Sequence, residues 1–432
     1  MRLHRTILQL SLPAIITNVT VPLLGLIDIA ISGHIGDSAE IGAIALGAMM
    51  FNMLYWNFTF LRMGTTGVTA QFYGARRDDM VSTTLFRALA IALAIGVAIL
   101  LLQVPLKSLL IALLAPSDRV ATLAGRYFYI CVWGAPAMLC TSALKGWYIG
   151  MQNSRFPMYI AVSVNVVNVA MSLLAVFVLG YGFVGIAVGT LVAQYFGIAL
   201  SVALLLCRYR RFLRLSHLRG VLEGEGLGKF FRVNRDIFIR SVCLLAVTAF
   251  FTSAGARSGD TVLAANALIM QLFLVFTYFM DGFAFAGEAL VGRCVGEEND
   301  AMLRRCVSAL LKWGLGVTLL FAVLYGGALP LILSLLTTSQ EVIDCAMRYR
   351  LWCLLIPVVG VSTFIWDGVF VGLTATRQLV YSIVCASALF FAVYFNPFTS
   401  RDNHLLWISF LLYIWVRGVV LWWCYRRRML KQ

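Results

Sequence analysis

The chain has 432 residues, of which 61% are hydrophobic and only 12% charged, and its mean hydropathy is +0.89. About a quarter of the residues of a soluble globular domain are charged, so this composition excludes a soluble protein. The formal net charge of +15 would suit nucleic acid, but the basic residues are spread over the connections between apolar segments, so no nucleic-acid partner is expected.

Apolar segments that can cross the roughly 30 Å hydrocarbon core as helices recur along the chain. Segments of alternating polarity, which a membrane barrel needs, are not the pattern seen. We therefore predict an all-α integral membrane protein with twelve spans, at 7–33, 41–71, 85–113, 121–150, 156–179, 183–207, 236–257, 262–293, 304–336, 342–373, 378–397 and 404–425. The polar stretch 208–235 is expected to be a cytoplasmic, partly helical linker. It separates an N-terminal six-helix lobe, 1–207, from a C-terminal six-helix lobe, 236–432, with a short basic tail.

Two motifs occur twice with the same separation. Gly74 in AQFYGARRDDM recurs as Gly296 in GRCVGEENDAM, and Gly150 in KGWYIGMQNSR recurs as Gly372 in DGVFVGLTATR, each 222 residues later. A constant separation near half the chain length predicts two pseudo-symmetric lobes of one architecture. Duplicated helical bundles of this kind are typical of membrane carriers, whose substrate path lies between the repeats.

Lys and Arg residues are concentrated on alternate connections between the predicted spans. The N-terminus, the linker and the C-terminal tail are rich in them, whereas the connections GHIGDSAE, LGYGF and TTSQEVIDC have none. Because cytoplasmic loops carry the excess of positive charge, both termini are predicted to be cytoplasmic. The basic balance of the chain then reflects topology and contact with membrane lipid.

An acid in the first span is the leading candidate for a functional site. Asp28 lies in the outer half of that span, downstream of Pro13 and Pro22. An ionisable side chain in lipid costs roughly 2.5–3.5 kcal/mol on insertion scales, so one that is retained is expected to face protein or water. Proline interrupts the helical hydrogen bonds and permits a bend. An acid beside a bendable helix predicts a protonation or cation switch; a purely structural pairing is the alternative.

Neutral polar residues in the fifth and sixth spans can join this acid. Asn165 and Asn168 in SVNVVNVAMS, and Thr190 in the next span, supply oxygen ligands of the kind that suit protons, water or Na⁺. Polar packing between helices accounts for the same residues equally well.

Charges also lie within the predicted spans of the second lobe. Asp281 and Glu288 are seven residues apart, which places them on one face of the eighth span. Asp367 in the tenth span is the repeat equivalent of Lys145 in the fourth. These four residues are expected to form a polar interior, in which Lys145 can pair with a buried acid such as Asp28.

Other polar residues have simpler explanations. Asp236 and Arg240, four residues apart at the inner end of the seventh span, predict a surface pair. The ten cysteines include no CxxC motif and are expected to be apolar fillers. The four histidines lie outside the predicted spans, so neither a metal site nor a cofactor is expected.

Several motifs together resemble the multidrug and toxic compound extrusion (MATE) transporters. They are the arrangement from Leu12-Pro13-Ala14-Ile15 to Asp28, GMQNSRFP after the fourth span, and DGVFVG in the tenth. Their order along the whole chain is similar to that of the DinF-like branch. The resemblance implies a V-shaped pair of six-helix lobes, acting as a monomer in the inner membrane, that exports organic cations or other toxic amphiphiles in exchange for protons or Na⁺.

The resemblance also implies roles for particular residues. The coupling acid maps onto Asp28, the helix bend onto Pro13, and the first-lobe polar cluster onto Asn168 and Thr190. Where many relatives carry an Asp on the fifth span, this chain has Ser172. Losing a carboxylate weakens a Na⁺ site more than a proton site, so the expected coupling ion is H⁺ and Na⁺ is the alternative.

Two other classes of function are less consistent with the sequence. A flippase or exporter of lipid-linked or anionic cargo from the same superfamily would commonly have more spans and a cation-lined cavity, whereas the predicted interior here is rich in acids. An enzyme would need a catalytic constellation, and HExxH, a suitably placed GxSxG and a nucleotide loop are not in the sequence. A secondary antiporter working by alternating access is therefore predicted.

Overall fold

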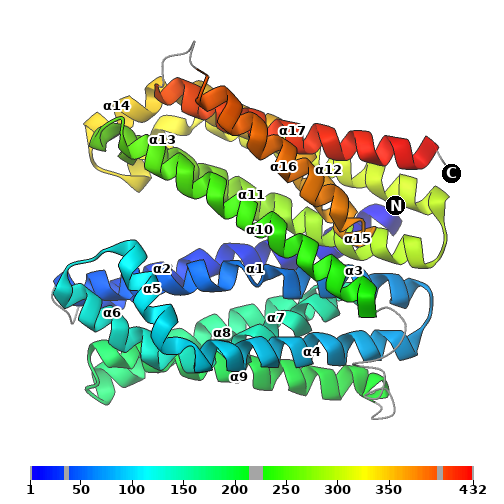
Figure 1. Ribbon diagram of the computed structural model, residues 1–432, viewed down its shortest axis with the longest axis horizontal. Coiled ribbons are helices and arrows are strands. Elements are labelled where there is room, and N and C mark those ends of the chain that lie inside the picture. The colour runs from blue at the N-terminus through cyan, green and yellow to red at the C-terminus, as the bar shows by residue number, and fades with distance from the viewer. Residues whose placement is uncertain (1, 34–37, 214–226, 397–401, 431–432) are drawn as a thin grey trace. The chain divides into compact units, whose positions relative to one another are not determined.

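A computed structural model describes residues 2–33, 38–213, 227–396 and 402–430, and Figure 1 shows that they form helices joined by turns. The helices of the first half are α1 (Arg2–Gly33), α2 (Ser38–Trp56), α3 (Thr59–Gly74), α4 (Asp78–Leu101), α5 (Gln103–Leu114), α6 (Asp118–Cys131), α7 (Ala135–Gly150), α8 (Arg155–Leu173) and α9 (Phe183–Tyr209), with the short segments η1 (Val132–Gly134), η2 (Leu174–Val178) and η3 (Arg210–Phe212). Those of the second half are α10 (Leu227–Ala256), α11 (Asp260–Gly296), α12 (Asp300–Gly327), α13 (Leu329–Leu336), α14 (Gln340–Arg348), α15 (Arg350–Gly372), α16 (Thr376–Tyr394) and α17 (Asn403–Leu430).

The all-α prediction is confirmed, and helices cover all twelve expected spans. Eleven helical stretches in the described part are long and apolar enough to cross a membrane, and α1, whose side chains are described only in part, covers the remaining expected span. Two helices begin earlier in the sequence than predicted. Helix α4 begins at Asp78, because acidic residues are favourable at a helix N-terminus, and α10 begins at Leu227, inside the expected linker.

The sequence repeat is matched by repeated backbone geometry. Arg76 and Glu298, which are 222 residues apart, follow the ends of α3 and α11 with positive φ angles of 56° and 52°. Gln152 and Thr374, separated by the same distance in sequence, have φ angles of 63° and 50°. Left-handed conformations are uncommon for residues other than glycine. Their recurrence at one fixed separation shows that the two halves share their turn geometry as well as their helix order.

Equivalent glycines allow two pairs of helices to cross closely. A side chain at Gly146 of α7 would collide with the backbone of Arg62 in α3. Its repeat equivalent, Gly368 of α15, lies in the same way against the backbone of Ala284 in α11. Small residues at helix crossings of membrane proteins permit this close packing. The α3–α7 and α11–α15 contacts are therefore equivalent in the two halves.

The replacement Gly146→Ala is expected to destabilise the protein by about 1–3 kcal/mol, because the added methyl group forces α3 and α7 apart. Gly316→Ala in α12 is the matched control, since a Cβ atom there meets nothing within 4 Å. The thermal denaturation of both detergent-purified variants checks this. An equal denaturation temperature for the two variants would contradict the crossing argument.

The chain divides into two compact units. The first-repeat unit is Ile16–Asn234, and the second-repeat unit combines Met1–Ile15 with Arg235–Gln432. This differs from the expected lobes, 1–207 and 236–432, because the start of α1 groups with the second half. The start of α10 groups with the first half. Helices α1 and α10 therefore each belong to both units.

Contacts within each unit explain this grouping. In the second-repeat unit, the Trp313 indole N–H donates to His4 Nδ1 at 3.1 Å, and Gly282 leaves room for Ile15. In the first-repeat unit, Lys229 Nζ donates to Gln71 Oε1 at 2.6 Å. Such contacts depend on tertiary folding and have no signature in the spacing of apolar residues.

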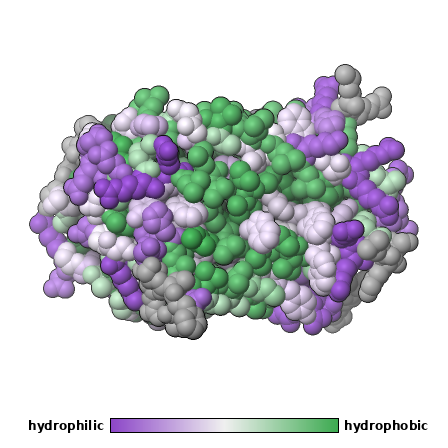
Figure 2. All heavy atoms as spheres, turned by 90° about the horizontal axis from the view of Figure 1, so that it is seen from above, coloured by the Kyte–Doolittle hydropathy of each residue, from purple (hydrophilic) through white to green (hydrophobic). Residues whose placement is uncertain are grey.

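The surface has the polarity expected of a membrane protein. Figure 2 shows a broad band of apolar residues across one face, with hydrophilic residues gathered towards both ends. Exposed apolar side chains are found on many helices, among them Leu101, Leu109, Val166, Val178, Leu319, Val323 and Leu335. Exposure of this kind is favourable against lipid tails and supports the assignment of membrane spans.

Candidate functional site

Side chains from three helices and the backbone of a fourth meet inside the first-repeat unit. Asn168 Nδ2 of α8 donates to Thr190 Oγ1 of α9 at 3.1 Å. One turn earlier on α8, Asn165 Nδ2 donates to the carbonyl of Thr20 in α1 at 3.0 Å. The thiol of Cys131 in α6 contacts the carbonyl of Ala187 in α9 at 3.6 Å. The expected contact between Asn168 and Thr190 is therefore present, and α6 joins them.

Asp28 lies beside this polar region. It is 9% exposed and within electrostatic reach of Tyr127 and Cys131. Tyr127 also interacts through its hydroxyl with Thr190 and Cys131, and Tyr55 of α2 interacts electrostatically with Cys131. We call this group the Asp28 cluster; its members are Asp28, Tyr55, Tyr127, Cys131, Asn168, Ser172 and Thr190.

Unpaired oxygen atoms are the chemical signature of the Asp28 cluster. Four buried oxygens, Asp28 Oδ1, Tyr55 OH, Asn168 Oδ1 and Ser172 Oγ, have no hydrogen-bond partner among the described residues. Buried polar atoms are nearly always paired in folded proteins, so a group of unpaired ones needs an explanation. The Asp28 carboxylate can accept a proton, and the four oxygens together can bind a water molecule or a small hard cation. A carboxylate is the one formal charge that the cluster contributes.

Irregular backbone flanks the Asp28 cluster on two sides. The 3₁₀ segment η1 follows Cys131 directly, and the π-helical segment η2 begins two residues after Ser172. π-Helical turns within helices occur frequently at functional sites. In membrane proteins, such irregularity is tolerated where the backbone is covered by protein or lines a cavity. The helical backbone is therefore irregular next to Cys131 and next to Ser172.

Lys145, which the sequence predicts to pair with a buried acid such as Asp28, lies on α7 of the first-repeat unit. Within the described ranges, no salt bridge joins Lys145 to an acid. Repeat equivalence with Asp367 fixes only the place of Lys145 on α7, and its pairing with Asp28 stays a prediction.

A second charged cluster lies inside the second-repeat unit. Asp367 Oδ2 of α15 accepts hydrogen bonds from Arg240 NH2 of α10 at 2.5 Å and from Arg417 NH2 of α17 at 2.6 Å. Arg417 and Asp367 are both buried, and the guanidinium of Arg417 stacks over the Tyr413 ring. The carboxylate therefore ties three helices together through two charge-assisted hydrogen bonds.

This cluster corrects the predicted surface pair of Asp236 and Arg240. Arg240 bonds to Asp367, whereas buried Asp236 accepts from Thr376 Oγ1 at 2.9 Å and pairs with its neighbour Arg235. Asp236 and Arg240 are four residues apart on one helix, but they do not pair with each other. Arg240 bonds to a residue of α15, whereas Asp236 bonds to a residue of α16 and to its neighbour in sequence.

The other predicted charges of the second lobe are only partly brought together. Asp281 of α11 is within electrostatic reach of Arg240 and so lies near the Asp367 cluster. Glu288 is buried on the same helix, 1% exposed, but it is not among the residues that act on Arg240. Asp281 and Asp367 therefore share one environment, in which two arginines balance two acids.

Two participants were missed from the sequence. Tyr127 lies in GRYFYIC, where three aromatic residues within the span give no reason to single one out. Arg417, in contrast, has a signal in the sequence. A single arginine in YIWVRGVVL, in the middle of the last apolar run, is the signal of a buried charge that needs a partner.

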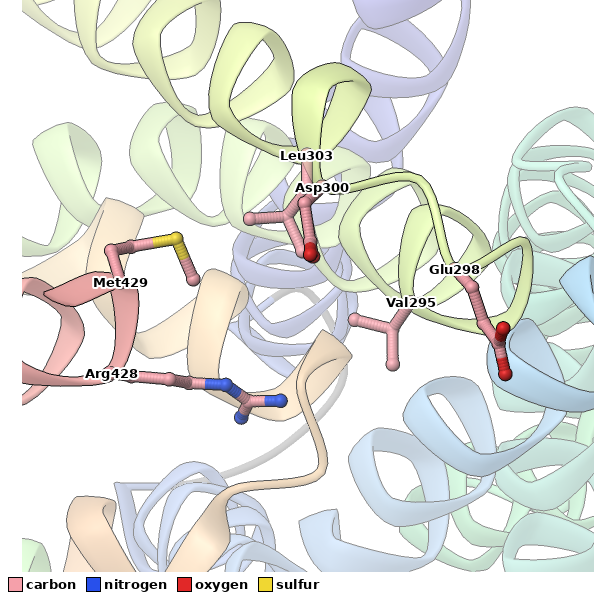
Figure 3. Close-up of a pocket in the computed structure, with 6 residues that line it drawn as sticks. All are labelled: Val295, Glu298, Asp300, Leu303, Arg428 and Met429. Carbon is pink, nitrogen blue, oxygen red and sulfur yellow. The ribbon is translucent and has the colours of Figure 1, made fainter. Parts of the chain in front are cut away.

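A pocket of about 200 Å³ lies away from both clusters, at the turn between α11 and α12. Figure 3 shows Glu298 and Asp300 at this turn and Arg428 reaching towards it from the end of α17. Its size and position at the helix ends do not suit a transport site in the middle of the membrane. In the described part of the chain, no group of three or more His, Cys, Asp or Glu residues could hold a metal ion.

Comparison with known proteins identifies the relatives of the chain. The MatE family model matches residues 13–174 and 237–397. The DNA damage-inducible protein F of Escherichia coli K12 is 36% identical over 97% of this chain and 91% of its own length. A probable multidrug resistance protein NorM of Acinetobacter baylyi is 24% identical, over 81% of this chain and 79% of its own length. A crystal structure of MATE in complex with MaD3S has a TM-score of 0.84 at 19% identity, covering 99% of this chain and 96% of that one, and so has the same fold.

Proposed function

The chain belongs to the MatE family of multidrug and toxic compound efflux transporters, and we propose that it exports organic cations or other amphiphiles in exchange for protons. Members of this family are transporters rather than enzymes and need no cofactor. We place the coupling step at Asp28 and the surrounding cluster. The protein is a multi-pass membrane protein; in the proposal it acts as a monomer in the inner membrane, with both termini cytoplasmic.

The observation that carries this proposal is the unpaired buried carboxylate. Asp28 Oδ1 lies among other unpaired oxygens, and no salt bridge within the described residues neutralises it. An uncompensated charge is costly away from water, so a bound proton or cation stabilises the inward position of this side chain. Exchange of that occupant for cargo is the elementary step of an antiporter, because each ligand favours a different conformation.

Protons fit the Asp28 cluster better than Na⁺. One proton neutralises the single carboxylate completely, and the remaining partners, Tyr55, Asn168 and Ser172, are neutral. Na⁺ binding benefits from more carboxylate charge, and Ser172 offers a hydroxyl where the family resemblance implies an acid. Ser172 is fully buried and lies against Gly189 of α9, where a side chain on the glycine would collide with the Ser172 hydroxyl.

Pro13 is the proposed bend of α1. The helix continues through Pro13 and Pro22 without interruption, and residue 15 is the last of its residues that groups with the second-repeat unit. A proline removes one backbone hydrogen bond and so lowers the cost of bending there. A change of occupant at Asp28 can therefore alter the shape of α1 at Pro13, two residues before the last residue of α1 that groups with the second-repeat unit. In the same proposal, Asp281 and Glu288 of α11 are the charges of the second-repeat unit that contact cargo.

Transport into proteoliposomes tests the proposed coupling. Purified protein is reconstituted, and accumulation of a panel of fluorescent amphiphilic cations is followed with an imposed pH gradient, an imposed Na⁺ gradient, or neither. We expect the pH gradient alone to drive accumulation. Drive by Na⁺ alone would overturn proton coupling, and no transport of any cation under either gradient would direct the search to lipid-linked or anionic cargo.

A further inference from the structure

Two cysteines face each other at the end of the α11–α12 hairpin. Cys294 Sγ and Cys306 Sγ are 3.7 Å apart, and both side chains are buried. They lie twelve residues apart in sequence, on opposite sides of the short turn that joins the two helices. This distance is close to the van der Waals contact of two sulfur atoms, so only a small movement separates the two thiols from a covalent bond.

A pocket lies at the same turn as the two cysteines. The pocket in Figure 3 opens at the same turn and is lined by Val295, the neighbour of Cys294, and by Leu303, three residues before Cys306. Turns at helix ends also deform more easily than the middle of a transmembrane helix. The two thiols are thus buried beside a turn whose neighbouring residues line a pocket at the helix ends.

We propose that Cys294 and Cys306 form a peroxide-oxidisable dithiol, a covalent modification site on this transporter. One thiol attacks hydrogen peroxide, becomes a sulfenic acid and releases one water. The second thiol attacks that sulfur, forming the disulfide and releasing a second water, so that two thiols and one peroxide give one disulfide and two waters. The product links α11 to α12, and a dithiol reductant reverses it.

Geometry, rather than exposure, distinguishes this pair from the other cysteines. Cys207 and Cys385 are exposed, and Cys385 lies within electrostatic reach of the half-buried Cys424. In the described part of the chain, Cys294 and Cys306 are the pair whose sulfur atoms are in direct contact. Exposure alone would make Cys207 and Cys385 react first, whereas proximity makes Cys294 and Cys306 cross-link.

Peptide mass spectrometry after peroxide treatment tests this proposal. The reduced full-length protein in detergent is treated with hydrogen peroxide, blocked with N-ethylmaleimide and digested. We expect a peptide pair joined through Cys294 and Cys306, severalfold more abundant than any pair containing Cys385 or Cys424, and absent after treatment with dithiothreitol. Recovery of both residues as maleimide adducts, or as separate sulfinic acids, would overturn the proposal.

A single replacement provides the second test. In Cys294→Ser, and likewise in Cys306→Ser, the joined peptide is expected to disappear, and in the variant that keeps the attacking thiol this thiol should be trapped by dimedone as a sulfenic acid adduct. Cys385→Ser is the matched control and should leave the Cys294–Cys306 peptide unchanged. The elution volume of each variant on size exclusion reports its fold. A folded Cys294→Ser protein in which Cys306 joins another cysteine just as efficiently would also contradict a dedicated pair.

Discussion

Replacement of Asp28 with Asn is expected to abolish export driven by a pH gradient and to leave the fold intact. The amide has nearly the shape of the carboxyl group but carries no exchangeable acid proton. The side chain also has no salt bridge to lose in the described part of the chain, so we expect little change in stability. Uptake of a fluorescent cation into proteoliposomes should fall to the level of protein-free liposomes.

Asp118→Asn provides the matched control for this experiment, because the same chemical change is made at an exposed acid at the start of α6. The control should transport like the unchanged protein. If Asp28→Asn protein, folded as judged by size exclusion, still concentrates cargo along a pH gradient, Asp28 is not the coupling residue.

The largest loss of stability is expected from Asp367→Asn. The replacement leaves the buried guanidinium groups of Arg240 and Arg417 without their shared carboxylate. Removing one member of a buried ion pair costs about 3–5 kcal/mol, because the remaining charge is left uncompensated. Thermal denaturation in detergent should show a marked decrease for this variant and almost none for Asp344→Asn, an exposed acid on α14.

A double replacement distinguishes the loss of a charge balance from other effects of Asp367→Asn. Adding Arg417→Met removes one of the uncompensated charges, so the double variant should be more stable than Asp367→Asn alone. Additive destabilisation by the two changes would contradict the cluster seen here. The outcome also bears on function, since a carboxylate held by two arginines is poorly suited to bind a cationic cargo.

The helical architecture could be predicted from the sequence because it depends on local properties. Apolar length determines where a helix can cross the membrane, and the constant separation of Gly74 from Gly296 exposes the repeat. Even here the prediction for α10 was too short. The polar residues before Asp236 are typical of a linker, but they form the start of α10. Lys229 in this segment donates a hydrogen bond to Gln71 of α3.

The candidate site could be predicted only in part, for a physical reason. Asp28, Asn168 and Thr190 stand out because polar residues are expensive in lipid, and each belongs to a separate apolar run. Their partners are decided by how helices rotate and cross. The spacing of Asp236 and Arg240 predicted a pair that tertiary packing replaced with the bond from Arg240 to Asp367. Tyr127 could not be singled out, because aromatic residues are common throughout the chain.

Proton movement driven by cargo is the most direct test of the central claim, that Asp28 exchanges a proton for cargo. Proteoliposomes containing a pH-sensitive dye are prepared without Na⁺, and a cargo gradient is imposed across the membrane. The account predicts that protons move in the direction opposite to the cargo, and that Asp28→Asn abolishes this proton flux. Cargo transport without proton movement, or an equal proton flux in Asp28→Asn, would contradict it.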